Sequence, residues 1–328
     1  MQIRSAFAIS VAVFGWLLLG ISVFSFTLRP NVLAAFTFIP AWILTTLGIL
    51  ISLLLVLVSK KIMLYLLCGW IIFAAIFAEE PKSLLRGLFD WNVRWNAIVA
   101  ERRLIVASLN CAGGRIAPVR EMLPFHPDIL LLQETPTNLD DLQKIAIEFF
   151  GDKAFVLMGK DTTIITRFEI EEVNLGRSLD GFMVYARLKT DSGVVLNVIS
   201  IRLMPPVIDT DLFSADCWQA HRNDRISRQK QVTKIAAVVD GIPRSEAVIV
   251  GGDFNVTAND GCLRSMPNRL SDSFGWSGIE WGHTATNELP LFRVDQVWTS
   301  KELNPITVSA VPTKNSDHRM VLCKLEIR

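Results

Sequence analysis

The sequence predicts an α/β domain that follows a membrane-spanning helical region. The first 78 residues contain four basic side chains and no Asp or Glu, although 51% of the chain is hydrophobic and its mean hydropathy is +0.37. From residue 104 onward, short β-branched apolar runs alternate with helical patterns, which is typical of α/β domains. We therefore expect a transmembrane region (1–78), a juxtamembrane linker or interfacial helix (79–103) and a domain of ordinary size (104–328).

Three uncharged runs predict three transmembrane helices. Residues 5–28 are long enough to cross a hydrocarbon core of about 30 Å, residues 41–58 are close to that length, and residues 62–78 are only just sufficient. A signal peptide is the alternative for the first run. No small-residue cleavage site follows it, however, and two further apolar runs do.

The loop charges give only a small preference for one orientation. Basic residues flank both sides of the predicted spans in nearly equal number, but Lys60-Lys61 occupies a very short loop, and Glu79-Glu80 accompanies the charges on the other side. We therefore expect the N-terminus inside the cell. Three crossings then give a multi-pass protein of the cell membrane with its C-terminal domain outside the cytoplasm.

The segment after the helices carries an apolar stripe at helical spacing. Leu84, Leu88, Trp91 and Trp95 recur at steps of four, three and four. Tryptophan favours the headgroup layer, so this segment fits an interfacial helix. A linker helix packed on the domain explains the pattern equally well.

The charge of the domain disfavours a nucleic-acid partner. Four of the 33 basic residues precede Glu79, which leaves 29 against 32 acidic residues and a formal net charge of −3. Proteins that grip nucleic acid through its phosphates are expected to show a basic excess.

Six runs within the domain predict strands, and two patterns predict helices. The strands are expected at residues 104–109, 129–132, 163–166, 183–188, 194–201 and 247–250, and the helices at 139–150 and 222–239. Arg222, Arg225 and Arg228 recur along the second helix, which indicates a solvated face more readily than a phosphate contact.

Polar residues gather where these strands end or near the C-terminus. They are Asn110, Glu134, Asp253, Asn255, Asp295 and the pair Asp317-His318. Since neighbouring strands end at a common edge of a sheet, such residues can meet in space. Each has an ordinary structural explanation on its own, such as a turn or the start of a loop.

Together, and in this order, these residues resemble the endonuclease/exonuclease/phosphatase superfamily. The strings that carry the resemblance are Ser-Leu-Asn110, Leu-Gln-Glu134-Thr, Gly-Gly-Asp253-Phe-Asn255, Arg-Val-Asp295-Gln-Val and Ser-Asp317-His318-Arg. The resemblance covers about residues 104–328. It implies a four-layer sandwich, in which two packed mixed sheets lie between outer helices.

The resemblance also implies a role for each residue. Phosphate esters repel nucleophiles, so a hard cation such as Mg²⁺ or Mn²⁺ must neutralise them, and Glu134, Asn110 and Asp317 would form the metal region. Asp253 would orient and deprotonate water, while Asn255 would donate to the developing phosphorane. His318, held by Asp295, would donate to a phosphoryl oxygen.

One position departs from the family. Where relatives commonly have a His before a Leu, this sequence has Arg202-Leu203. A guanidinium suits phosphate and can stabilise a leaving oxygen, but it does not readily give up a proton. We therefore count Arg202 among the catalytic residues and expect the departure to affect rate or substrate.

The sequence thus predicts a membrane-anchored, divalent-metal-dependent phosphoesterase. The resemblance extends to bacterial membrane proteins linked to teicoplanin resistance, which have three N-terminal helices, so a lipid-linked phosphate is the favoured substrate and the lipid bilayer the expected partner. A membrane-tethered nuclease and a non-catalytic binding module are the alternatives. Retention of Glu134 and His318 argues against the second of these.

Overall fold

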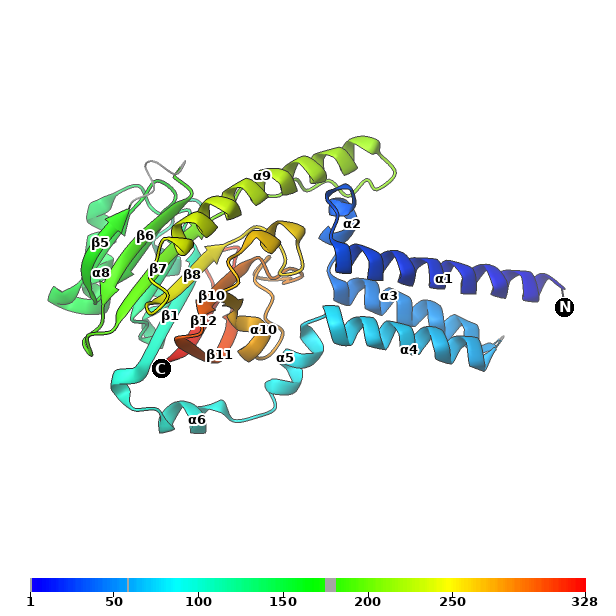
Figure 1. The fold of residues 1–328 in the computed structure, drawn as a ribbon, viewed down its shortest axis with the longest axis horizontal. Coiled ribbons are helices and arrows are strands. Elements are labelled where there is room, and N and C mark those ends of the chain that lie inside the picture. Colours follow the sequence, from blue (N-terminus) through cyan, green and yellow to red (C-terminus); the bar gives the residue numbers. More distant parts are fainter. Residues whose placement is uncertain (1, 58, 175–180) are drawn as a thin grey trace. The chain divides into compact units, whose positions relative to one another are not determined.

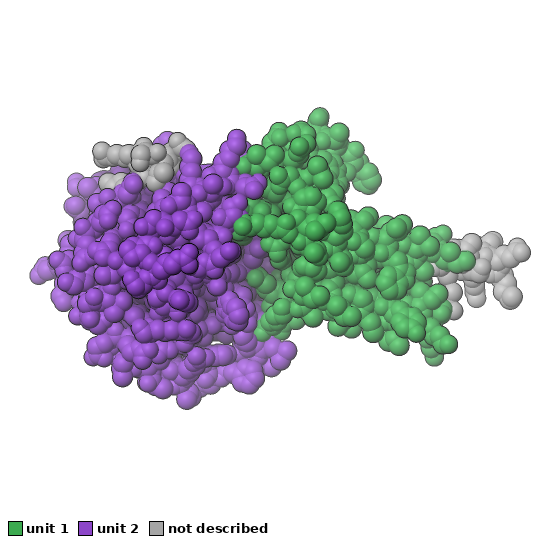
Figure 2. Space-filling view, in the orientation of Figure 1, with its two compact units in different colours: residues 1–82, 207–226, 259–264 green, residues 83–206, 227–258, 265–328 purple. Residues whose placement is uncertain are grey.

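The computed structural model describes residues 2–57, 59–174 and 181–328, and the chain forms two compact units (Figure 2). The helical unit contains Met1–Lys82 together with two later segments, Val207–Ile226 and Asn259–Arg264. The sheet unit contains Ser83–Pro206, Ser227–Ala258 and Ser265–Arg328. Two short segments that lie far along the sequence are therefore part of the same compact unit as the N-terminal helices.

The helical unit is built on α1 (Gln2–Leu28), α3 (Ala41–Leu54) and α4 (Lys60–Phe77), with the short α2 (Ala34–Phe38) between the first two (Figure 1). Among the described residues, α1 and α4 are long and apolar enough to cross a membrane. The third span exists only if residues 31–38 and 41–54, bent by 71°, count as one. The 14 residues of α3 alone reach about 21 Å, short of a core of about 30 Å.

Large side chains fill the centre of the helical unit and leave apolar faces outside. Leu66, Trp70 and Phe73 are buried, and a Cβ on Gly48 would lie 2.0 Å from the Trp70 ring, so only glycine permits this approach of α3 to α4. The outward side chains of the same helices are apolar and exposed, as Phe14 and Ile72 illustrate. Such faces suit contact with lipid.

The sheet unit contains two mixed six-stranded sheets. The first has the order β11-β12-β1-β2-β4-β3 and the second β5-β6-β7-β8-β10-β9. The strands of the first sheet are β1 (Arg103–Asn110), β2 (Ile129–Gln133), β3 (Phe155–Met158), β4 (Thr162–Thr166), β11 (Leu303–Val311) and β12 (Met320–Ile327). Those of the second are β5 (Glu169–Asn174), β6 (Met183–Lys189), β7 (Val195–Arg202), β8 (Ala247–Asp253), β9 (Leu270–Asp272) and β10 (Asp295–Ser300).

Side chains alternate between the two faces of each strand, so a strand contributes to one packed layer on each side of its sheet. In β2, Leu131 points into the core shared by the two sheets, while Leu130 and Leu132 pack with α8 (Leu139–Phe150) on the other face. The later part of the long helix α9 (Ala215–Asp240; Figure 1) lies near the end of β7, where Gln231 accepts from the backbone N of Met204. The predicted sandwich of two mixed sheets with outer helices is confirmed, and the six expected strand runs coincide with β1, β2, β4, β6, β7 and β8.

The segment between the N-terminal helices and β1 contains two short helices, α5 (Glu80–Arg86) and α6 (Trp91–Ala97), in place of one continuous stripe. Arg86 donates hydrogen bonds to carbonyl oxygens of residues 274–278, and Trp95 is buried beneath Arg103 and Lys324. Leu88, at the break between the helices, is 82% exposed. Residues 83–97 are thus held on the sheet unit while part of their apolar stripe stays uncovered.

The arginines of α9 do not form a solvated face. Arg222 is exposed, but Arg225 and Arg228 are buried. Within the helical unit, Arg225 pairs with Asp260 at 3.0 Å and donates to the carbonyl oxygen of Pro30 at 3.2 Å and to Thr37. The expectation of a solvated face was wrong for Arg225 and Arg228 because their contacts are with segments far away in the sequence.

Candidate active site

The sheet register brings the predicted polar residues to one edge of the sheet unit. Asn110 ends β1, Glu134 directly follows β2, and Asp253 ends β8. Asp295 begins β10 and pairs with Asp253 across antiparallel strands, while Arg202 at the end of β7 pairs with Asp253 across parallel strands. Backbone pairing therefore places Arg202, Asp253 and Asp295 side by side within the second sheet.

Asn110 links the two sheets. Its Nδ2 donates to Glu134 Oε1 at 3.1 Å and to Asp253 Oδ2 at 3.1 Å. Its own Oδ1 accepts from the backbone N of Ala112, which fixes the amide orientation. A single amide group thus holds one carboxylate from each sheet in place.

Arg202 joins two carboxylates. Its Nη2 donates to Glu134 Oε1 at 2.6 Å and its Nη1 to Asp161 Oδ2 at 2.8 Å. Burial disfavours the cation, but the hydrogen bond and charge of Asp161, with the charge of Glu134, raise the pKa of Arg202. The guanidinium therefore stays charged and shares one Glu134 oxygen with Asn110.

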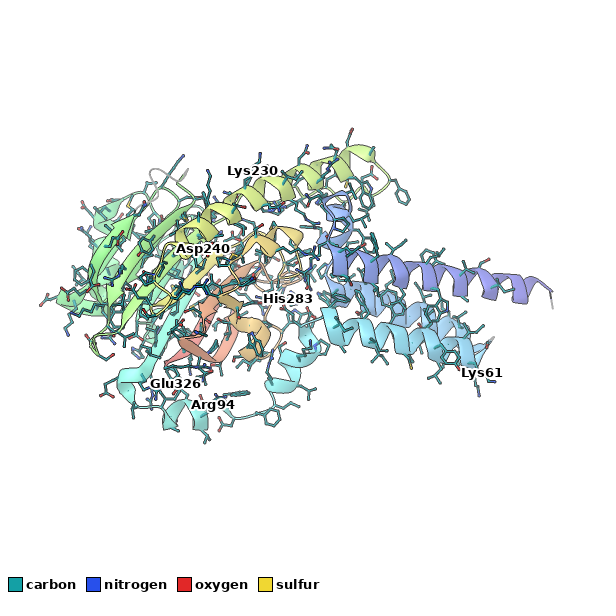
Figure 3. The ribbon with its side chains drawn as sticks, in the orientation of Figure 1. Lys61, Arg94, Lys230, Asp240, His283 and Glu326 are labelled. Carbon is teal, nitrogen blue, oxygen red and sulfur yellow. The ribbon has the colours of Figure 1, made fainter. Side chains whose placement is uncertain are left out.

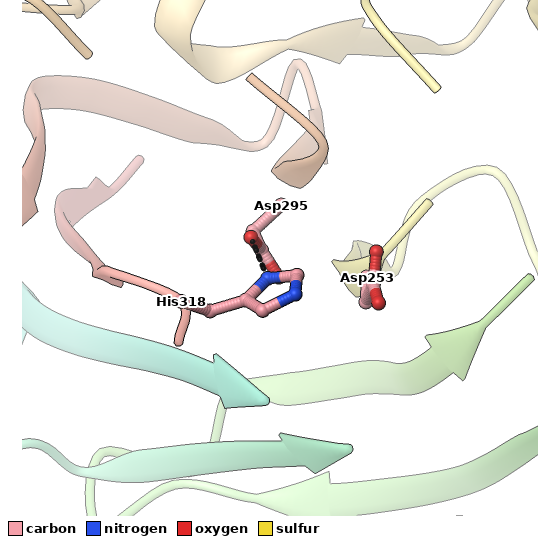
Figure 4. Close-up of side chains that lie close together, drawn as sticks. All are labelled: Asp253, Asp295 and His318. Carbon is pink, nitrogen blue, oxygen red and sulfur yellow. Dashed lines mark hydrogen bonds and ion pairs between the residues drawn. The ribbon is translucent and has the colours of Figure 1, made fainter. Parts of the chain in front are cut away.

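His318 and Asp295 form the other pair of the site (Figure 4). His318 Nδ1 lies 2.8 Å from Asp295 Oδ2. Burial disfavours the imidazolium, yet the charge and hydrogen bond of Asp295 outweigh it and raise the pKa of His318 to about 10. When the ring is protonated, Nδ1 donates to Asp295 and Nε2 is a second donor.

Asp253 is almost fully buried, and its carboxyl group is correspondingly hard to ionise. Burial, followed by the charge of Asp295, raises its pKa to about 7. Its Oδ1 accepts from the backbone N of Asn255 at 2.9 Å. Asn255 in turn donates from Nδ2 to the carbonyl oxygen of Leu203 at 2.8 Å.

The backbone is strained at two of these residues. Glu134 has a φ of 46° and Asn255 a φ of 52°. Both lie in the left-handed region, which residues other than glycine seldom adopt. Gly252 has φ of 144°, and a Cβ there would lie 2.0 Å from the carbonyl oxygen of Ile201. Conformations of this kind persist where the surrounding structure enforces them, and they cluster at functional sites.

The donor set fits a hard divalent cation. One ligand atom from each of Asp253, Asp295 and His318 lies within 4.8 Å of the others. Asp295 Oδ1 is buried without a hydrogen-bond partner among the described residues, and carboxylate oxygens are the ligands that Mg²⁺ and Mn²⁺ prefer. An imidazolium offers no lone pair to a metal, so the carboxylates suit this role better than His318.

Asp317 differs from Asp253 and Asp295 in its exposure to solvent. It is exposed, and its backbone carbonyl accepts from the N of Asn287. The metal-capable group found among the described residues does not include it. Its charge does act on His318, whose pKa it helps to raise.

Sequence reasoning missed residues that hold the site together. Asp161 braces Arg202; it precedes β4 directly, so the same pattern of a polar residue beside a strand could have identified it. Ser316 donates to the carbonyl oxygen of Asn110 at 2.7 Å and accepts from the N of His318, which fixes the turn before β12. No pattern in the sequence indicates this second link.

Comparison with known proteins agrees with the fold. Residues 91–318 match the endonuclease/exonuclease/phosphatase family. The chain therefore belongs to this family, whose members are metal-dependent phosphoesterases. No curated protein matches the chain at a significant level.

Solved structures share the fold at low sequence identity. A family protein from Bacteroides thetaiotaomicron has a TM-score of 0.55 at 18% identity, with 69% of this chain and 98% of that chain covered. A mannosyl-6-phosphatase from the same organism has a TM-score of 0.52 at 18% identity, covering 68% and 99%. TDP2 of D. rerio, complexed with a single-strand DNA product, has a TM-score of 0.51 at 15% identity, covering 68% and 99%.

Proposed function

We propose that this protein is a membrane-anchored, divalent-metal-dependent phosphoesterase that hydrolyses a phosphate ester near the membrane surface. The observation that carries the proposal is the hydrogen-bonded network at the edge of the two sheets. In it, Asn110 joins Glu134 to Asp253, and Asp295 orients His318. A lipid-linked phosphate is the substrate class that we favour.

The proposed metal site uses the carboxylates of this edge. Glu134 and Asn110, with Asp317 from the family resemblance, would hold Mg²⁺ or Mn²⁺ beside the buried pair Asp253 and Asp295. The cation, when bound, supplies positive charge that neutralises the phosphoryl oxygens. Arg202, hydrogen-bonded to Glu134, adds a second fixed positive charge at the same edge.

The remaining roles follow from hydrogen-bonding capacity. Asp253 is the proposed acceptor for the proton of the attacking water, with its carboxylate held in place by Asn110 Nδ2 and by the backbone N of Asn255. His318 Nε2 is the proposed donor to a phosphoryl oxygen, since Asp295 holds the ring through Nδ1. Asn255 is the proposed amide that steadies the phosphorane. Its Nδ2 already donates to Leu203, so its remaining N–H is the one available for this contact.

Membrane anchoring is supported by the helical unit, whose two long apolar helices are suited to span a bilayer. We propose that the sheet unit lies outside the cytoplasm, as the loop charges favour. A phosphate ester carried by a lipid would then be presented to the enzyme at the bilayer surface.

A membrane-tethered nuclease is the second candidate, and one observation favours it: TDP2 of D. rerio, complexed with single-strand DNA product, has the same fold. The mannosyl-6-phosphatase has the same fold as well. The formal charge of −3 over residues 79–328 favours the phosphatase-like alternative. A non-catalytic binding module would not need a network of this kind.

One assay tests the proposal. The full chain in detergent or nanodiscs is given lipid phosphates, sugar phosphates and single- and double-stranded DNA, with Mg²⁺, with Mn²⁺ and with EDTA. We expect metal-dependent release of phosphate or of the phosphorylated headgroup from a lipid substrate. Cleavage of DNA alone would establish the nuclease, and no turnover of any substrate with either metal would favour a binding module.

A further inference from the structure

A loop of the helical unit holds large apolar side chains in solvent. Residues 207–214, called here loop 207–214, form the last part of the connection from β7 to α9 and belong to the same compact unit as the N-terminal helices. Ile208 is 83% exposed and Phe213 is fully exposed. The two side chains thus leave a large apolar area of this loop uncovered by the rest of the chain.

Hydrogen bonds fix the conformation of this loop. Asp209 Oδ1 accepts from the backbone N of Asp211 at 2.9 Å, and Asp211 Oδ1 accepts from the N of Phe213 at 3.1 Å. Trp218 Nε1, on the first turns of α9, donates to the carbonyl oxygen of Leu212 at 2.9 Å. The outward direction of Phe213 is therefore set by two successive Asx turns and an indole anchor.

The loop lies at the α2 end of the helical unit. His221 Nε2 is 2.8 Å from the carbonyl oxygen of Asp209, and the same imidazole ring lies 5.2 Å from the ring of Phe38 in α2. Figure 1 shows the start of α9 beside α2, and Figure 3 shows Lys61, in the first turn of α4, at the opposite end of the helices. Loop 207–214 is thus placed where α1 ends and α3 begins.

We propose that loop 207–214 inserts Phe213 and Ile208 into the interfacial layer of the bilayer that the helices span. At this end of the unit, Leu28 and Val32 are 51% and 57% exposed, so apolar surface continues from the lipid-facing helices to the level of the loop. An aromatic ring on a structured loop suits the boundary between acyl chains and headgroups. The proposal rests on the membrane anchoring proposed above and not on catalysis.

The charges of the loop specify how it binds. Asp209 and Asp211 are the acidic residues between Ile208 and Phe213, and their carboxylates already serve the turns. Anionic headgroups do not attract an acidic loop, so they add no favourable binding free energy. Insertion is therefore driven by apolar burial, and it does not depend on the anionic lipid content of the membrane.

Chain connectivity gives this insertion a consequence for the candidate active site. Val207 follows Arg202 by five residues, which can extend over about 18 Å at most. A loop held in the bilayer surface would keep the end of β7 within that distance of the headgroup layer. This arrangement suits a phosphate ester carried by a lipid.

The experiment uses an environment-sensitive NBD label on the full chain in phosphatidylcholine nanodiscs. Phe213→Cys and Ile208→Cys are labelled after Cys68→Ala removes the exposed native thiol, since Cys111, Cys217, Cys262 and Cys323 are buried. Ile147→Cys is the matched control, because Ile147 is 58% exposed on α8 of the sheet unit. We expect blue-shifted emission at positions 208 and 213, with several-fold stronger quenching by nitroxide lipids than at position 147.

Two results would overturn the proposal. One is iodide quenching at positions 208 and 213 as strong as at position 147, without quenching by nitroxide lipids. The other is insertion that appears only when anionic lipid is added, because it would show electrostatic docking. Both readouts are independent of turnover, so a failed activity assay leaves them unaffected.

Discussion

Arg202 is held between two carboxylates, and this limits what a guanidinium at this position can do. Its bonds to Glu134 and Asp161 leave Nε buried without a partner among the described residues. A residue so constrained is a fixed charge beside the proposed metal ligand. It is poorly suited to swing onto a distant headgroup.

We expect Arg202→Ala to lower kcat and kcat/KM together by about 100-fold, because a preorganised positive charge acts on the transition state. Arg202→Lys should recover little, since an ammonium group cannot reproduce the two-carboxylate bridge. Steady-state kinetics on the best substrate measure both variants. Asp161→Asn is the control, because it loosens the brace and leaves the cation in place.

A raised KM with unchanged kcat would instead assign Arg202 to substrate binding. Wild-type kinetics in the alanine variant would remove it from the catalytic machinery altogether.

Glu134 gives a sharper test, because its isosteric amide keeps the shape and removes the charge. We expect Glu134→Gln to abolish metal-dependent hydrolysis and to weaken metal binding, measured by calorimetric titration with Mn²⁺. Glu148→Gln is a matched control, since Glu148 pairs with Arg120 on the exposed side of α8. Full activity of Glu134→Gln in EDTA would contradict the proposed mechanism.

At the scale of elements, α9 shows that a sequence pattern predicts where a helix forms but not which of its side chains are buried. Helical spacing predicted residues 222–239 as a helix, and α9 contains them, because periodicity is a local property. Whether Arg225 faces water depends on Asp260 and Pro30, which lie 35 residues later and 195 residues earlier. No local pattern encodes such partners. The same holds for Ser316, whose partner Asn110 is 206 residues away.

The strands that could be predicted are mostly the ones buried on both faces. Five residues of β2 and five of β4 are all buried, so their apolar or β-branched runs are continuous. In contrast, β5 is mostly exposed and charged, and β9 has three residues. Asn110, Glu134 and Asp253 were recognisable because each lies at or just after the end of a predicted strand, whereas Asp295 and His318 were identified only through the family resemblance.

The prediction at the scale of elements concerns the stability that the buried ion pair between Arg225 and Asp260 contributes. Arg225 and Asp260 have side chains that are 1% and 9% exposed, and removing one partner from such a pair costs about 3–5 kcal/mol. We expect Arg225→Ala to lower the thermal unfolding midpoint of the purified chain by several degrees. Arg222→Ala, one turn earlier and exposed, should change stability by less than about 0.5 kcal/mol. Equal midpoints for the two variants would mean that the buried pair contributes nothing.

At the scale of the whole molecule, the prediction concerns sidedness. If the N-terminus lies inside and the helices cross three times, the residues after Ala78 are reachable from outside the cell. Protease added to intact spheroplasts should then remove the sheet unit. Complete protection, with cleavage only after lysis, would reverse the proposed topology, and a cytoplasmic marker protein controls for leakage.

The contacts of the candidate site cross from one sheet to the other. Asn110 to Asp253, Glu134 to Arg202 and His318 to Asp295 each join a residue from the first sheet to one from the second. Each sheet therefore carries only part of the candidate site, and the proposed hydrolysis would require the two sheets to stay packed together. In a denaturant titration, turnover should disappear before the far-ultraviolet circular dichroism of the strands, because loosened packing separates the two parts while backbone hydrogen bonds survive.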